Sequence, residues 1–128
     1  MLDFTFSGLV IDRRPKILVL FEIPAYKKTK MVDFLVDSGS IFSAITEKEA
    51  SIMGIDCDFL PYSKREAVGF GGLFKTKMIN RPVNLTFKSN KAEHTIKCSS
   101  FTVICSPPNI SKEDREKLLR YTPNVLGM

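Results

Sequence analysis

Residues 34–40 read FLVDSGS, an apolar run that ends at one aspartate and is followed at once by small residues. A carboxylate at the end of a buried strand is costly unless hydrogen bonds or a function compensate for it. Gly39, two residues after Asp37, permits a backbone turn that other residues resist. An ordinary turn also fits, because Asp, Ser and Gly commonly open turns. The stretch predicts a strand ending at Asp37 and leaves the role of its carboxylate open.

The rest of the chain is also rich in strand patterns. Alternating apolar, β-branched and aromatic residues occupy residues 16–23, 31–37, 83–87, 94–98 and 101–105. Turn residues separate these segments, with Pro24 before a lysine cluster and Ser89 before Asn90. Short connections between such strands indicate a mainly antiparallel sheet.

Two segments are predicted to be helices, each with a capping residue. Thr46 and Glu49 form a capping box at the start of the segment that includes KEASIM, residues 48–53. Ser111 opens the second helix, and Pro123 follows it as a stop.

The composition is that of one globular domain. The chain has 128 residues, of which 44% are hydrophobic and 26% charged. No apolar run approaches the roughly 20 residues of a membrane-spanning helix. The first 15 residues contain Asp3 and lack a small-residue cleavage site, so they do not read as a secretory signal. We expect a cytoplasmic protein without membrane association, with residues 1–12 as an N-terminal arm or extra strand and 13–128 as a single domain.

The cysteines do not predict a disulfide framework or a metal site. Cys57, Cys98 and Cys105 are odd in number, which favours a reducing compartment. Together with His94 they could supply four zinc ligands, but the chain has no CxxC pair and no second histidine. We expect buried thiols, a strand histidine, and no metal or cofactor.

The net charge of +5 raises the question of nucleic-acid binding. The basic residues form small separate groups, acids are interspersed with the last group, and no recognised binding motif surrounds any of them. Solvated strand ends and helix faces explain this distribution, so we expect no nucleic-acid partner.

A second distinctive stretch is VGFGGLFKT, residues 68–76, where glycines flank Phe70. It does not fit a dinucleotide fingerprint, because Phe74 occupies the third glycine position and no helix follows. It does not fit a phosphate-binding Walker loop either, because Lys75 follows Phe74 and not a glycine. It suits a mobile β-hairpin over an extended ligand, although an ordinary glycine-rich hairpin fits as well. A third stretch, TPNVLG at 122–127, predicts only a strand that begins and bends.

In this order the three stretches resemble the retropepsin-like aspartic peptidases, single-domain relatives of pepsin typified by the retroviral proteases. The resemblance runs from about Lys16 to Gly127. It implies a mainly β acid-protease fold, a closed or partly open antiparallel β-barrel with two short helices. The matched groups are the catalytic triplet Asp37, Ser38 and Gly39, the flap residues Val68, Gly69, Phe70, Gly71 and Gly72, and the terminal motif Val125, Leu126 and Gly127, whose glycine crosses behind the catalytic loop.

The resemblance implies an aspartic endopeptidase that acts on extended peptide or protein substrates. Family members carry one aspartate per chain, and two chains bring their aspartates together at a twofold axis. Close carboxylates share a proton, so one Asp37 acts as general base on water and its mate as general acid. Ser38 resembles a brace between the two catalytic loops. We hypothesise that the Ser40 hydroxyl donates to Asp37 and stabilises its ionised form.

The chain departs from the family pattern at its end. Family members usually continue through a short helix into a C-terminal strand of the dimer interface, whereas this sequence ends at Met128. We expect that this strand is absent, that residues 1–10 replace it, or that the homodimer is weak. The alternative function is a catalytically silent retropepsin-like module that binds a peptide or dimerises through the same groove.

Overall fold

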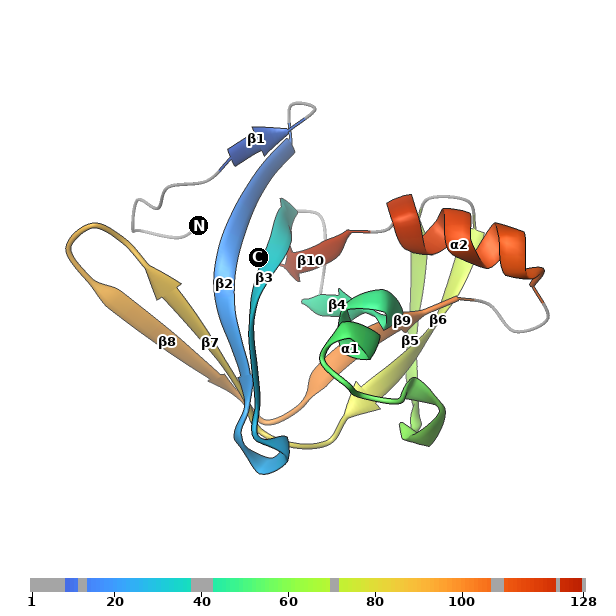
Figure 1. Ribbon diagram of the computed structural model, residues 1–128, viewed down its shortest axis with the longest axis horizontal. Coiled ribbons are helices and arrows are strands. Elements are labelled where there is room, and N and C mark those ends of the chain that lie inside the picture. The colour runs from blue at the N-terminus through green and yellow to red at the C-terminus, as the bar shows by residue number, and fades with distance from the viewer. Residues whose placement is uncertain are drawn as a thin grey trace.

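The computed structural model describes residues 9–11, 14–37, 43–69, 72–106, 110–121 and 123–127. Strands predominate, and they curl into one half-barrel sheet with two short helices packed beside it (Figure 1). The elements in chain order are β1 (Leu9–Ile11), β2 (Arg14–Ile23), η1 (Pro24–Tyr26), β3 (Lys28–Asp37), β4 (Ala44–Thr46), α1 (Glu47–Ile52), η2 (Cys57–Phe59), β5 (Tyr62–Gly69), β6 (Gly72–Ile79), β7 (Val83–Lys88), β8 (Glu93–Cys98), β9 (Phe101–Cys105), α2 (Lys112–Tyr121) and β10 (Asn124–Gly127). The prediction of a mainly β fold with two short helices is confirmed.

The sheet has the strand order β5-β6-β9-β4-β10-β3-β2-β7-β8, and β1 pairs with β2. Most neighbours are antiparallel, as predicted. Two pairs are parallel, β10 with β3 and β4 with β9. The β3–β10 pair arises because the chain returns after α2 and inserts its last strand between β3 and β4. This return places the terminal strand beside the end of β3.

Buried side chains of β2, β3 and β9 contribute to the core. On β2, alternate residues such as Val19 and Phe21 are fully buried. Leu18, which precedes Val19 and points to the opposite face, is 51% exposed. Every residue of β9 is buried, so this strand has protein on both faces. The ring of Phe101 lies edge-on to Phe21, with ring centroids 5.1 Å apart. These contacts join the two halves of the sheet into one core.

Both predicted helices begin at their predicted caps. Thr46 Oγ1 accepts the Glu49 N–H at 3.2 Å at the start of α1. Ser111 Oγ accepts the Asp114 N–H at 3.2 Å at the start of α2. After α1 the chain reverses at Gly54, whose φ of +81° favours glycine.

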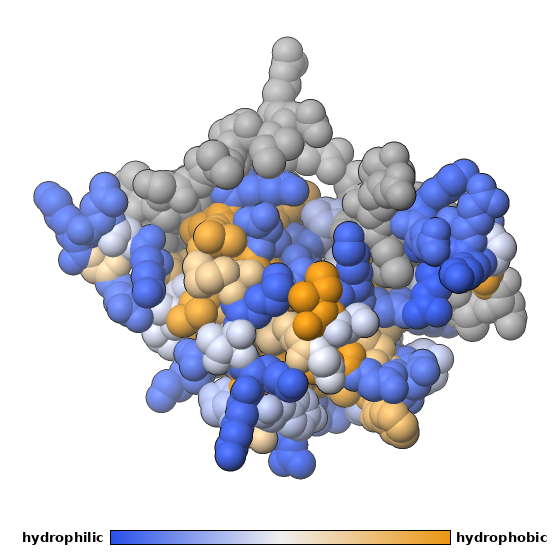
Figure 2. Space-filling view, viewed as in Figure 1, coloured by the Kyte–Doolittle hydropathy of each residue, from blue (hydrophilic) through white to orange (hydrophobic). Residues whose placement is uncertain are grey.

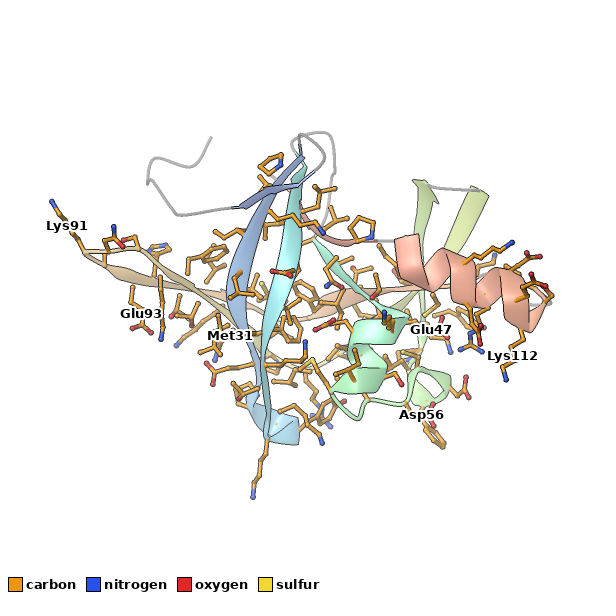
Figure 3. All side chains as sticks on the ribbon, turned by 45° about the horizontal axis from the view of Figure 1, so that its top comes forward. Met31, Glu47, Asp56, Lys91, Glu93 and Lys112 are labelled. Atoms are coloured by element: carbon orange, nitrogen blue, oxygen red, sulfur yellow. The ribbon has the colours of Figure 1, made fainter. Side chains whose placement is uncertain are left out.

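The β7–β8 hairpin extends away from the helices. Lys91 and Glu93 lie at its far end (Figure 3). Ser89 closes the turn, because its N–H donates to the Ala92 carbonyl at 2.8 Å. The predicted turn at Ser89 and Asn90 is therefore confirmed.

Candidate active site

Asp37 is the last residue of β3, as the apolar run before it predicted. Phe34 and Leu35 are buried, and Val36 packs against the core. The strand is therefore anchored up to the residue that precedes the carboxylate. The other predicted catalytic-loop residues, Ser38, Gly39 and Ser40, lie outside the described residues.

The terminal motif lies directly beside the end of β3. Leu126 pairs with Val36, and Gly127 pairs with Asp37, in the parallel β3–β10 ladder. The Gly127 N–H also donates to Ser43 Oγ at 3.0 Å. Gly127 thus contacts the residues on both sides of segment 38–42.

Asn124 connects the strands on either side of β10. Its Nδ2 donates to the Asp33 carbonyl at 3.0 Å, and its Oδ1 accepts the Thr46 N–H at 2.8 Å. Both partners are backbone groups, so the side chain replaces ladder hydrogen bonds that the short β10 cannot make. The sequence analysis did not single out Asn124. The feature of the sequence that could have pointed to Asn124 is its polar amide at the start of an otherwise apolar stretch.

The glycine-rich stretch forms a hairpin, as predicted. Gly69 at the end of β5 pairs with Gly72 at the start of β6, and Val68 pairs with Leu73. Phe70 and Gly71, between the two strands, lie outside the described residues. The end of β3, the end of β5 and the start of β6 lie on the same side of the molecule, at the top of Figure 1, and β10 lies between β3 and these two strands. The predicted flap and catalytic strand therefore end on one side of the sheet.

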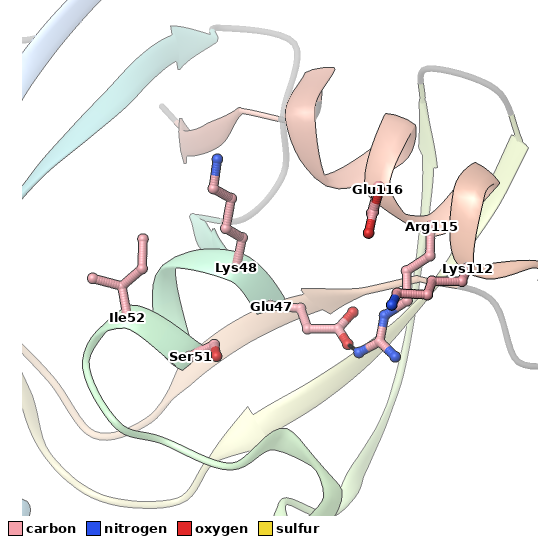
Figure 4. A pocket seen from close by; sticks show the side chains of 7 residues that line it. All are labelled: Glu47, Lys48, Ser51, Ile52, Lys112, Arg115 and Glu116. Carbon is pink, nitrogen blue, oxygen red and sulfur yellow. Dashed lines mark hydrogen bonds and ion pairs between the residues drawn. The ribbon is translucent and has the colours of Figure 1, made fainter.

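A pocket between the two helices contains none of the predicted site residues. It has a volume of about 340 Å³ and is lined by Glu47, Lys48, Ser51, Ile52, Lys112, Arg115 and Glu116 (Figure 4). Hydrophilic residues dominate the surface of α2 beside it (Figure 2). Charges of both signs line it, and Glu47 is already engaged by Arg115, so the lining does not favour ions of one sign.

Glu47 joins three elements at this point. Its carboxylate accepts the Ser106 N–H at 3.0 Å and the Ser106 hydroxyl at 2.9 Å, and it forms an ion pair with Arg115. It therefore ties α1 to the segment after β9 and to α2. The sequence analysis identified the first turn of this helix but not these distant partners.

A second pocket, of about 260 Å³, shares Glu47 and Arg115 and reaches Cys57 and Cys105. Within the described ranges, no cluster of three or more His, Cys, Asp or Glu side chains is arranged to hold a metal ion. The helices in the same ranges include none that is long and apolar enough to cross a membrane.

Comparison with solved structures places this arrangement among known folds. The chain is similar to a retropepsin-like aspartic protease from Rickettsia conorii, with a TM-score of 0.54 and 19% identity over 91% of this chain and 76% of that one. It is also similar to EIAV protease complexed with the inhibitor HBY-793, with a TM-score of 0.53 and 19% identity over 94% and 88% of the two chains. No protein-family model and no curated protein matches the sequence. The chain has a retropepsin-like fold, and at this identity the likeness concerns the fold alone.

Proposed function

We propose that this protein is an aspartic endopeptidase whose active site is built from Asp37 of two identical subunits. The observation that carries the proposal is the pairing of Gly127 with Asp37 at the end of β3, within a retropepsin-like fold. The sequence contains a single Asp-Ser-Gly triplet, so a pair of such aspartates needs a second chain. A C2 homodimer is the simplest assembly that supplies it.

The proposed chemistry follows from two carboxylates held close together. They cannot both ionise readily, so the pair shares one proton and titrates in two coupled steps. The ionised Asp37 removes a proton from a bound water, which attacks the scissile carbonyl. The protonated Asp37 of the other subunit donates to the carbonyl oxygen, and a proton then passes to the leaving amine. The reaction needs no metal, nucleotide or covalent intermediate.

The proposed roles of the remaining residues concern substrate binding and positioning. In our proposal residues 13–128 act as one catalytic domain. Val68, Gly69, Phe70, Gly71 and Gly72 form a flap that hydrogen-bonds an extended peptide through its backbone. Ser38 braces the two catalytic loops, and Ser40 donates to Asp37. Apolar side chains around the flap favour large apolar residues on either side of the cleaved bond.

A cleavage assay tests the proposal. Purified protein is incubated with a denatured protein substrate over roughly pH 3 to 7, where carboxylate pairs titrate. We expect cleavage that is abolished by Asp37→Asn and by a statine-type inhibitor. Asp33→Asn is the matched control, because Asp33 is an exposed carboxylate on the same strand. Cleavage that survives Asp37→Asn contradicts the proposal, and inhibitor binding without cleavage supports the silent module instead.

A further inference from the structure

Two of the three cysteines meet at a site that the proposed mechanism does not use. Cys57 begins η2 and Cys105 ends β9, and the two residues line the same pocket. Cys105 belongs to the buried core, whereas Cys57 packs against that core and is only half-buried. The third cysteine, Cys98, lies on β8 opposite Val83. The fold therefore pairs one accessible thiol with one buried thiol and keeps Cys98 in a different part of the sheet.

The surroundings make the two thiols unequal. The neighbouring Cys105 side chain lowers the pKa of the Cys57 thiol, and the nearby Lys77 ammonium acts in the same direction, against burial and the carboxylates of Glu47 and Asp56. The neighbouring Cys57 side chain, together with burial, raises the pKa of Cys105. Cys57 is also the more accessible of the two thiols, so it is the member that more readily forms a thiolate.

Lys77 is held in place beside this pair. Its side chain is buried, its Nζ donates to the Cys57 carbonyl at 2.6 Å, and it lies over the Tyr62 ring, 4.8 Å from the centroid. The backbone of Cys57 is therefore anchored to β6 through Lys77. A fixed cation beside a half-buried thiol is a typical environment of a reactive cysteine.

Both thiols line the pocket of about 260 Å³ described above. Its other lining groups include Lys75, Arg115, Asp58 and Ser106, so much of the lining is polar. A water molecule occupies about 30 Å³ in the liquid, so a small polar oxidant such as hydrogen peroxide fits easily.

We propose that Cys57 and Cys105 form a peroxide-sensitive dithiol site, in which Cys57 is the attacking thiol and Cys105 the resolving thiol. The Cys57 thiolate attacks hydrogen peroxide, so an S–O bond forms and the O–O bond breaks. The departing hydroxide takes up a proton and leaves as water, and Cys57 becomes a sulfenic acid. Cys105 sulfur then attacks Cys57 sulfur. An S–S bond forms, the S–O bond breaks, and the second oxygen leaves as water with the proton of Cys105. Two thiols lose two electrons in total, and one peroxide is reduced to two waters.

The disulfide crosslinks η2 to β9 next to the start of the β5–β6 hairpin. Leu60 and Pro61 connect η2 to β5, and the Pro61 carbonyl accepts the Met78 N–H of β6 at 2.9 Å. The bond therefore fixes the base of this hairpin to the core. Slower amide exchange across residues 57–60 is the expected structural consequence.

Peptide mapping of peroxide-treated protein tests the site without any activity assay. Fully reduced native protein is treated with equimolar hydrogen peroxide, alkylated, denatured and analysed by mass spectrometry. We expect an intramolecular Cys57–Cys105 crosslink that a phosphine reductant reverses, with Cys98 recovered in its alkylated thiol form. Cys98→Ser is the matched control and retains the crosslink. Protein treated in urea loses the selectivity, because the pairing depends on the fold.

Single replacements test the two roles separately. In the Cys105→Ser variant, we expect the oxidation of Cys57 to stop at the sulfenic acid, which dimedone traps. In Cys57→Ser, Cys105 survives as a thiol. Before oxidation, we expect iodoacetamide to modify Cys57 about tenfold faster than Cys98, because burial raises the pKa of the Cys98 thiol. Recovery of both Cys57 and Cys105 as thiols, or crosslinks that involve Cys98 or a second chain, overturns the proposal.

Discussion

At the scale of single residues, Asn124 is the side chain that holds the terminal strand in register. It satisfies the Thr46 N–H and the Asp33 carbonyl on opposite neighbouring strands. Thr46 is only 4% exposed, so Asn124→Ala leaves a buried N–H without its partner. We expect a loss of about 1–3 kcal/mol in the free energy of unfolding, measured by urea denaturation. Asn90→Ala on the exposed β7–β8 turn is the control, and equal effects of the two variants contradict this role.

Two phenylalanines give a matched comparison of the core and the surface. Phe101 is 3% exposed and contacts the rings of Phe21 and Phe34, whereas Phe59 is 85% exposed. Phe101→Ala removes a buried ring and leaves a cavity, so we expect a loss of about 3–5 kcal/mol. Phe59→Ala should change stability by less than about 0.5 kcal/mol. Thermal and urea unfolding check both values, and a large loss in Phe59→Ala shows that the exposed ring has a partner.

Ser40 provides a prediction about pH dependence. In our proposal its hydroxyl stabilises the ionised Asp37, which lowers the pKa of that carboxyl. Removing the hydroxyl therefore raises this pKa, and the acid limb of the cleavage profile moves to higher pH in Ser40→Ala. Ser40→Thr retains a hydroxyl and should keep the original profile. An unchanged acid limb in Ser40→Ala contradicts the hypothesis.

Individual residues were predictable from the sequence when their role depended on near neighbours. The strand end at Asp37 and the caps Thr46 and Ser111 follow from residues within a few positions of each. The meeting of Cys57 and Cys105 at one pocket depends on elements far apart in the chain. No local pattern encodes such a contact, so the cysteines could be predicted only as buried thiols.

At the scale of elements, Glu47 couples α1 to α2 and to the segment after β9. Its side chain is 12% exposed and accepts from Ser106 and Arg115. Glu47→Ala leaves the Ser106 N–H unpaired and removes the ion pair, so we expect a loss of about 1–3 kcal/mol in the free energy of unfolding. Glu113 is the matched control, because it also lies in the first turn of its helix, α2. Its side chain is 81% exposed, so Glu113→Ala should change the free energy of unfolding very little. Equal losses in chemical denaturation contradict the coupling.

The elements were predictable to different degrees. Strands such as β2 and β9 carry long apolar patterns, and both helices carry caps, so their types and approximate bounds could be read from the sequence. β4 was missed because three residues, Ala44–Thr46, are too few to show an alternation. The parallel pairing of β4 with β9 was missed because pairing between distant strands is a property of the whole sheet.

At the scale of the whole molecule, the fold brings the first and last motifs of the chain together. Asp37 ends β3, Gly127 pairs with it, and the β5–β6 hairpin ends on the same side of the sheet (Figure 1). The order of the three stretches along the chain made the resemblance to retropepsin-like peptidases specific. Each stretch alone also fits an ordinary turn, hairpin or strand. The central claim that follows is that two copies of Asp37 make one active site.

Mixed dimers test that claim most directly. Wild-type and Asp37→Asn chains are denatured together in varied ratios at constant total concentration and refolded, and the cleavage rate is measured for each mixture. If each active site needs Asp37 from both chains, the rate follows the square of the wild-type fraction and falls to about one quarter in an equal mixture. A rate that falls in proportion to the wild-type fraction, to about one half in the same mixture, contradicts the shared site.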